Sequence, residues 1–152
     1  MTKLSSKDVL RILDLQPHPE GGAYRETYRS KNPAKVDPQR SVCTAIYFLV
    51  QAHQKTEWHR VKNDEMYHHY AGATLDVLLV SPDGVFEKHK LGDDLETGAR
   101  PQLLIPGGYW QSVQAHDSWV LVGCTVSPGF DFSDFELSNE AALKKQFPHL
   151  SF

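Results

Sequence analysis

Apolar and polar residues alternate with a period of two over most of the chain, and short breaks rich in glycine, proline, asparagine and aspartate interrupt the alternation. Such alternation predicts β-strands with one buried face, and the breaks predict turns. The expected strands cover residues 23–30, 42–51, 56–61, 65–70, 74–80, 85–91, 102–105, 109–115 and 118–126. Many short strands separated by frequent turns predict an antiparallel sandwich or barrel.

Short helices are expected at both ends of the chain. Val9, Leu10 and Leu13 have helical spacing and follow a serine pair that can cap a helix. Residues 136–147 predict a closing helix, which Pro148 ends. Since the chain contains no linker and no internal repeat, residues 1–152 are interpreted as one domain.

Composition and charge exclude several classes of partner. The 16 Lys and Arg against 19 Asp and Glu give a net charge of −3, which is not typical of a nucleic-acid binder. The longest apolar runs are too short to span a bilayer, and the first residues lack the apolar core of a signal peptide. Cys43 and Cys124 lie inside apolar runs, which favours reduced thiols and a cytoplasmic location. A small molecule is therefore the expected partner.

The 8 histidines make the chain unusually rich in the side chain that binds metals and exchanges protons near neutral pH. Residues two apart on a strand share a face, so Glu57 and His59 are expected to point the same way. A hairpin around residues 62–64 would make His59 and Glu65 near neighbours across two strands. An imidazole and a carboxylate that converge inside a β-shell can bind a metal or move a proton.

Further residues are expected around this pair. Tyr67 and His69 share the predicted face of Glu65, so both are candidates to line a pocket. Glu20 and Tyr24 flank a glycine pair and are expected to reach the mouth of the barrel. The phenylalanines of residues 130–135 are expected to fold back and cap the barrel or to seal a subunit contact.

Two segments resemble the sequence motifs of the cupins, which are small jelly rolls. The first cupin motif, His-x-His, Glu and then Gly, corresponds here to Glu57-x-His59, Glu65 and Gly72. The second, Pro-x-Gly followed by His, corresponds to residues 106–108 followed by Gln111. Glutamate and glutamine therefore stand where cupins carry two of their metal-binding histidines. The resemblance implies that a divalent metal, if bound, is held by His59, Glu65, Gln111 and Glu57, a set that favours Mn²⁺, Mg²⁺ or Ca²⁺.

A closer similarity is to the cupin-5 family, formerly a domain of unknown function. It rests on His-Pro-Glu-Gly-Gly-x-Tyr-Arg-Glu-Thr at 18–27, on 45–49, on His59-Arg60, on Asp64-Glu65 and on the segment 121–132. The resemblance implies an all-β fold, the cupin double-stranded β-helix or jelly roll, with short N- and C-terminal helices. It also implies a homodimer whose shape is related to sugar-nucleotide epimerases. The family has no settled reaction.

Three functions stay open. The leading hypothesis is an epimerase or isomerase of small, polar, sugar-like carbonyl compounds. In it His59 or Glu65 removes a proton, Tyr67 or Glu20 returns one, and Gln111 donates a hydrogen bond to the enolate oxygen. The second is a metal-dependent oxygenase or isomerase. The third is a protein that binds a small ligand without turnover.

Overall fold

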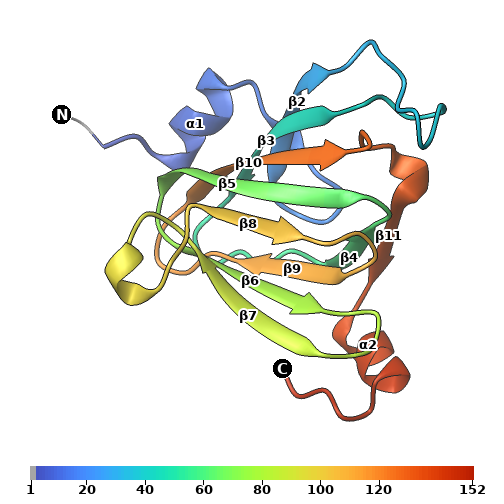
Figure 1. Cartoon of the computed structure of the whole chain (residues 1–152). Helices are drawn as coiled ribbons and strands as arrows, with labels where there is room; N and C mark the ends of the chain where they lie inside the picture. The colour runs from blue at the N-terminus through green and yellow to red at the C-terminus, as the bar shows by residue number, and fades with distance from the viewer. Residues whose placement is uncertain (1–2) are drawn as a thin grey trace.

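The computed structural model describes residues 3–152 and consists of two antiparallel β-sheets that face each other, with a short helix near each end of the chain (Figure 1). The larger sheet has the strand order β1-β2-β3-β10-β5-β8. Its strands are β1 (Gln16–Pro17), β2 (Ala23–Arg29), β3 (Thr44–Val50), β5 (Asp64–Gly72), β8 (Gln102–Ile105) and β10 (Val120–Ser127). The smaller sheet has the order β11-β4-β9-β6-β7. Its strands are β4 (Trp58–Val61), β6 (Leu75–Val80), β7 (Phe86–Leu91), β9 (Trp110–Gln114) and β11 (Phe135–Ser138).

The helices agree in part with the sequence pattern. Helix α1 (Ser6–Ile12) begins after Ser5, whose side chain forms a reciprocal capping box with Asp8. The predicted closing helix over 136–147 was too long, because its first residues form β11 and pair with β4. Helix α2 (Glu140–Gln146) begins only after Asn139, whose side chain accepts a hydrogen bond from the Ala142 amide. Two 3₁₀ turns, η1 (Leu95–Thr97) and η2 (Phe132–Asp134), complete the elements.

The predicted hairpin between residues 56–61 and 65–70 was wrong. Strands β4 and β5 lie in opposite sheets, so the connection through Lys62 and Asn63 crosses from one layer to the other. Both edges of β4 are occupied, by β9 and β11, while β5 pairs with β8 and β10. The Asn63 side chain donates to the Pro128 carbonyl, and the Asp64 carboxylate accepts from the Gly107 amide. These bonds stabilise the crossing. As a result His59 and Glu65, which were expected on paired strands, face each other from opposite sheets.

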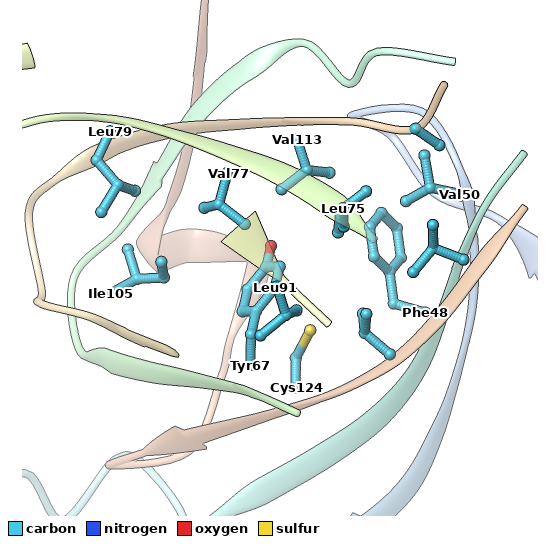
Figure 2. Close-up of a cluster of buried hydrophobic side chains, with 13 residues drawn as sticks. Phe48, Val50, Tyr67, Leu75, Val77, Leu79, Leu91, Ile105, Val113 and Cys124 are labelled. Carbon is cyan, nitrogen blue, oxygen red and sulfur yellow. The ribbon is translucent and has the colours of Figure 1, made fainter. Parts of the chain in front are cut away.

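One part of the interior is filled by apolar side chains from both sheets (Figure 2). Its members are Phe48, Val50, Tyr67, Leu75, Val77, Leu79, Leu91, Ile105, Val113, Ala115, Val120, Val122 and Cys124. A second cluster packs on the outer face of the smaller sheet and consists of Trp58, Leu78, Val80, Trp110, Leu143 and Leu150. Helix α2 therefore covers that sheet from outside, and strands β4, β6 and β9 are largely buried on both faces. No helix within residues 3–152 has the length and apolar character needed to cross a membrane.

Candidate functional site

A cavity of about 240 Å³ lies between the sheets, next to the filled part of the interior. Strands β2, β3, β5 and β10 of the larger sheet and β4 of the smaller one contribute to its wall. The segment 130–135 contributes three phenylalanines. The lining residues are His18, Glu20, Tyr24, Glu26, Arg29, Thr44, Ile46, Phe48, His59, Val61, Glu65, Tyr67, Cys124, Val126, Phe130, Asp131, Phe132 and Phe135.

The loop 18–22 brings the first acidic residue into the cavity. The His18 amide donates to the Gly22 carbonyl, and the Gly21 amide donates back to the His18 carbonyl. Gly22 has a φ of 75°, and a Cβ at this position would lie 2.8 Å from both the Leu49 carbonyl and the Phe48 ring. Only glycine fits this close approach. The tight turn fixes Glu20, which is 5% exposed, against the cavity.

Glu20 and His59 form a buried pair that shares a proton. The His59 Nε2 atom lies 2.7 Å from Glu20 Oε2, and the imidazole is 2% exposed. The His59 Nδ1 atom lies 2.9 Å from the Glu57 carbonyl oxygen, which can only accept, so Nδ1 carries a hydrogen. The bond to Glu20 must then hold one further proton. Burial lowers the pKa of His59, but the adjacent Glu20 carboxylate, the Glu57 carbonyl and the Glu65 charge outweigh it and raise the pKa overall.

Glu65 lies on the opposite sheet and has no cationic partner of its own. Gln111 Nε2 donates to Glu65 Oε2 over 2.9 Å, and the Tyr67 hydroxyl donates to Gln111 Oε1 over 2.9 Å. Burial raises the pKa of Glu65 to about 7; the bond from Gln111 opposes this rise and the Glu20 charge adds to it. The carboxyl group therefore gains or loses its proton near neutral pH, and a single residue can both accept and donate a proton there.

His18 is the second histidine of the cavity. Its Nδ1 atom accepts a hydrogen bond of 3.2 Å from the Glu20 amide, so the hydrogen of the neutral ring is on Nε2. Burial lowers the pKa of His18, which keeps this tautomer uncharged; Glu20 opposes the shift and His59 supports it. Four aromatic rings surround the imidazole with centroid distances of 4.6–6.1 Å, namely Tyr24, Phe48, Phe132 and Phe135.

The segment 130–135 forms a roof over the cavity, as the expectation of capping phenylalanines stated. The rings of Phe130, Phe132 and Phe135 contact one another at centroid distances of 4.9–6.2 Å. Two arginines tie the roof to the larger sheet and its 30–43 loop. Arg29 Nη2 donates to the Phe130 carbonyl, and Arg40 binds both carboxylate oxygens of Asp134 at 2.7 and 3.0 Å.

The structure brings five of the eight predicted site residues to the cavity wall: His59, Glu65, Tyr67, Glu20 and Tyr24. Gln111 lies directly behind the wall, bonded to two of them. The expectation that Glu57 shares the inward face of His59 was wrong, because β4 begins at Trp58 and the Glu57 side chain is exposed. His69 also lies away from the cavity. In the pairing with β10, His69 lies opposite Val122 of the filled core, two residues beyond Tyr67, and its ring bonds the Ala73 carbonyl.

Sequence reasoning missed His18, Glu26, Arg29 and Asp131 as wall residues. A signal for His18 was present in the segment His-Pro-Glu-Gly-Gly, because a glycine pair that allows a tight turn also fixes the directions of its neighbours. Arg29 and Asp131 carried no comparable signal. They meet the cavity only through the contact of β2 with a segment about a hundred residues later.

The donor set expected for a metal is not assembled. Glu57 is exposed outside the cavity, and both ends of the Gln111 amide are bound by Tyr67 and Glu65. His59 Nε2, which would have to face a cation, is bonded to Glu20. Over residues 3–152, no three His, Cys, Asp or Glu side chains are arranged to hold a metal ion. These residues do not fit the cupin metal site.

Comparison with solved structures confirms the cupin fold. Protein SO0799 from Shewanella oneidensis superposes with a TM-score of 0.88 at 40% identity, over 96% of this chain and 92% of that one. A hypothetical protein from Leishmania major gives 0.87 at 30% identity, over 95% and 93%. Oxalate decarboxylase from Bacillus subtilis matches with a TM-score of 0.62 at 16% identity, over 89% of this chain and 35% of that protein, which is a likeness of fold alone.

Sequence comparison gives the family. An uncharacterized protein of Saccharomyces cerevisiae, YML079W, is 27% identical over 158 residues, which cover 92% of this chain and 79% of the yeast protein. The model of one family, described as Cupin superfamily (DUF985), matches residues 7–138. The fold, the relatives and this match agree with the resemblance found in the motifs, and the chain belongs to the Cupin_5 family of the cupin superfamily.

Proposed function

We propose that this protein binds a small carbonyl compound in the cavity between its sheets and moves a proton at the carbon next to the carbonyl, as an epimerase or isomerase does. The observation that carries the proposal is the presence of two proton-carrying groups in one cavity. These are the His59–Glu20 pair, with 2.7 Å between its polar atoms, and Glu65, with a pKa of about 7. Perturbed carboxyl groups that face a cavity are typical of proton-transfer sites.

Glu65 is the proposed base. In its ionised form it takes the proton from the carbon, and the electron pair of the broken C–H bond moves to the carbonyl oxygen as an enolate. The proton shared by His59 and Glu20 stabilises that oxygen and can protonate it. Return of a proton to the same carbon exchanges or inverts it, and the enediol of a hydroxy ketone can be reprotonated at the neighbouring carbon.

Gln111 and Tyr67 act in this proposal as positioning residues. Gln111 was expected to contact the enolate oxygen, but it lies behind Glu65 and its amide group is fixed between Glu65 and Tyr67. The Tyr67 hydroxyl donates its hydrogen to Gln111, and burial raises the pKa of Tyr67 well above its usual value. Gln111 holds Glu65 Oε2 directly and Tyr67 fixes Gln111, so together they orient the carboxyl group for proton transfer.

Deuterium exchange tests the proposal. The protein is incubated in D₂O at neutral pH with an uncharged ketone, benzylacetone or dihydroxyacetone, and the loss of the signal from the hydrogens beside the carbonyl is followed by proton NMR. We expect exchange well above the buffer rate, a return to the buffer rate in Glu65→Gln, and no change in Glu96→Gln, which alters an exposed glutamate of η1. Exchange that persists in Glu65→Gln overturns the role of Glu65. If the wild-type protein binds the ketone saturably but catalyses no exchange, the proposed reaction is wrong and the protein is a ligand-binding protein.

The proposal also includes a homodimer. Beyond Ala23 and Tyr24, which pair with β1, the outer edge of β2 has no partner strand among residues 3–152. Tyr28 and Tyr70 on the larger sheet are each 54% exposed. An open strand edge and exposed aromatic rings favour association. Light scattering at micromolar concentration should give about twice the chain mass of 17.2 kDa, and the mass of one chain would exclude the dimer.

A cytoplasmic location completes the proposal. Cys43 and Cys124 are both free, and Cys124 is buried beside Glu65 in the cavity wall. Burial raises the pKa of Cys124 well above its usual value, which makes the thiol unreactive. Titration of the denatured protein, purified without reductant, should find both thiols free, and finding none would contradict a reducing compartment.

A further inference from the structure

The charges of the side chains that line the cavity limit the chemical class of ligand that it can bind. Four carboxyl groups line it: Glu20, Glu26, Glu65 and Asp131. Its single arginine, Arg29, is already neutralised, because Nη2 lies 2.6 Å from Glu26 Oε1 and Nε donates to the other oxygen of the same carboxylate. The same Nη2 also donates to the Phe130 carbonyl. Two of the three nitrogen atoms of the Arg29 guanidinium are therefore engaged, and its charge is paired with Glu26 before any phosphate or carboxylate binds.

An anionic ligand would moreover face the charge of Glu65. This carboxyl group is 7% exposed, and its hydrogen-bond partners are the uncharged side chains of Gln111 and Cys124. A second negative charge in the same small space raises the free energy of binding, since neither charge has a cation to pair with. The His59–Glu20 pair adds no net positive charge, because its two partners compensate each other.

The rest of the wall is apolar and largely aromatic. Rings from five residues and three aliphatic side chains enclose the space: Tyr24, Phe48, Phe130, Phe132, Phe135, Ile46, Val61 and Val126. Its volume of about 240 Å³ is below the range usual for drug-sized ligands. A sugar nucleotide is too large and too highly charged for this space, and a polyol would leave most of its hydroxyl groups unpaired against the rings.

His18 supplies the wall with a neutral donor that can recognise an oxygen atom. His18 Nδ1 is occupied by the Glu20 amide, so the ring presents Nε2–H, which no hydrogen bond within residues 3–152 engages. The His18 side chain is 8% exposed and lines the cavity. A donor on a mostly buried side chain that faces a cavity gains from a ligand oxygen that accepts its hydrogen.

We infer that the cavity takes an uncharged, mostly apolar carbonyl compound of the size of a small aryl ketone, whose oxygen accepts a hydrogen bond from His18, and that it excludes carboxylates, phosphate esters and sugar nucleotides. This inference rests on the proposed function and narrows its substrate class from sugar-like compounds to compounds with an aromatic or branched aliphatic group. It also assigns a role in binding to His18, which was not among the predicted site residues.

The test compares ligands of nearly one shape. Benzylacetone is the uncharged ketone, hydrocinnamate carries a carboxylate in place of its methyl ketone, and phenylpropylamine carries a cation. Binding is measured by titration calorimetry at pH 8, where Glu65 is mostly ionised. We expect benzylacetone to bind roughly ten-fold or more tightly than hydrocinnamate, and the preference to narrow at pH 6 and in Glu65→Gln. Equal or tighter binding of hydrocinnamate, of phenylpropylamine or of UDP-glucose overturns the inference, as does the absence of saturable benzylacetone binding at millimolar concentration.

A variant tests the donor. His18→Phe keeps a flat ring and removes the Nε2–H group, so affinity for benzylacetone should fall roughly ten-fold while affinity for propylbenzene, which has no oxygen, stays unchanged. His89→Phe, a histidine of β7 outside the cavity, is the matched control. Equal losses for both ligands would show that His18 acts only through packing and overturn its assignment. Deuterium exchange separates the two proposals. If benzylacetone binds but its hydrogens do not exchange, the proposed reaction is wrong and the proposed ligand class stands. If an anionic ketone such as phenylpyruvate exchanges and benzylacetone does not, the proposed ligand class is wrong and the reaction stands.

Discussion

The two parts of the interior are built by the same strands and have opposite chemistry. Strand β5 contributes Glu65 to the cavity and Tyr67 to both parts, while β3 contributes Ile46 to the cavity and Val50 to the filled core. In the filled part leucine and valine side chains meet from both sheets. In the hollow part three ionisable groups, Glu20, His59 and Glu65, are each less than 10% exposed. The fold needs only the first part, so the free-energy cost of the second part indicates a function.

The two parts also differ in how their polar atoms are satisfied. The pair His59–Glu20 compensates its own charge, whereas Glu65 is held by neutral donors alone and takes up a proton instead. In a core that binds no ligand, an apolar residue in place of such a group would cost little stability or increase it. The difference predicts that the filled part controls the stability of the protein and that the hollow part controls binding and its pH dependence.

The largest expected effect is on stability in the filled part. Leu75→Ala removes a side chain that is 0% exposed and should reduce the free energy of unfolding by about 3 kcal/mol. Ile46→Ala removes the same number of carbon atoms from a half-buried side chain that already borders the cavity, and should cost about 1 kcal/mol. Urea unfolding of both variants measures the contrast. Equal losses would show that the two parts are packed alike.

The second prediction concerns the pH dependence that Glu65 gives to folding. Because its pKa is about 7 in the folded protein and 4.5 is its usual value, the folded state binds more protons between these two pH values. Stability therefore falls as the pH rises through this window, on the order of 2–3 kcal/mol in total by pH 8. Glu65→Gln keeps an oxygen for Gln111 Nε2 but does not titrate, so it should gain this amount relative to the wild-type protein between pH 4.5 and pH 8.

Urea unfolding of the wild-type protein, Glu65→Gln and the exposed control Glu96→Gln at both pH values provides the measurement. The raised pKa of His59 acts in the same direction, since its stabilising contribution is present below its usual pKa and is lost as the pH rises through the raised value. This contribution is common to the wild-type protein and Glu96→Gln, and Glu65→Gln loses only the part of it that the Glu65 charge supplies. If Glu96→Gln alters the pH dependence of the free energy of unfolding as much as Glu65→Gln does, this pH dependence does not come from the buried carboxyl group.

Local patterns predicted most of the strands and the direction of the key side chains. Alternation placed His59 and Glu65 on inward faces, because the parity of a strand is a property of neighbouring residues. The choice of sheet was not predictable in this way. Both edges of β4 pair with strands more than forty residues away, which no turn signal at 62–64 reveals. Alternation failed at Glu57, which precedes the strand. It also gave no sign that the cavity does not extend to His69, which lies opposite Val122 of the filled core.

The smallest expected effect lies at the roof of the cavity, where the hollow part meets solvent. Arg40 binds Asp134 through two hydrogen bonds and Ser133 through a third. The contact between Arg40 and Asp134 holds the pKa of Arg40 above its usual value and the pKa of Asp134 below its usual value. Asp134→Asn keeps the shape of the side chain and removes its charge, so the phenylalanines of 130–135 should be held less firmly over the ligand. Affinity for benzylacetone should fall about three- to five-fold, mainly through faster dissociation, with a melting temperature within about 2 °C of the wild-type value. Glu140→Gln is the matched control, because it removes the ion pair with Lys55 at 2.6 Å, a contact outside the cavity. If Asp134→Asn leaves the dissociation rate unchanged, as the control does, the prediction is wrong. The ring contacts would then be enough to hold the roof, and the hollow part of the interior would be as rigid as the filled one.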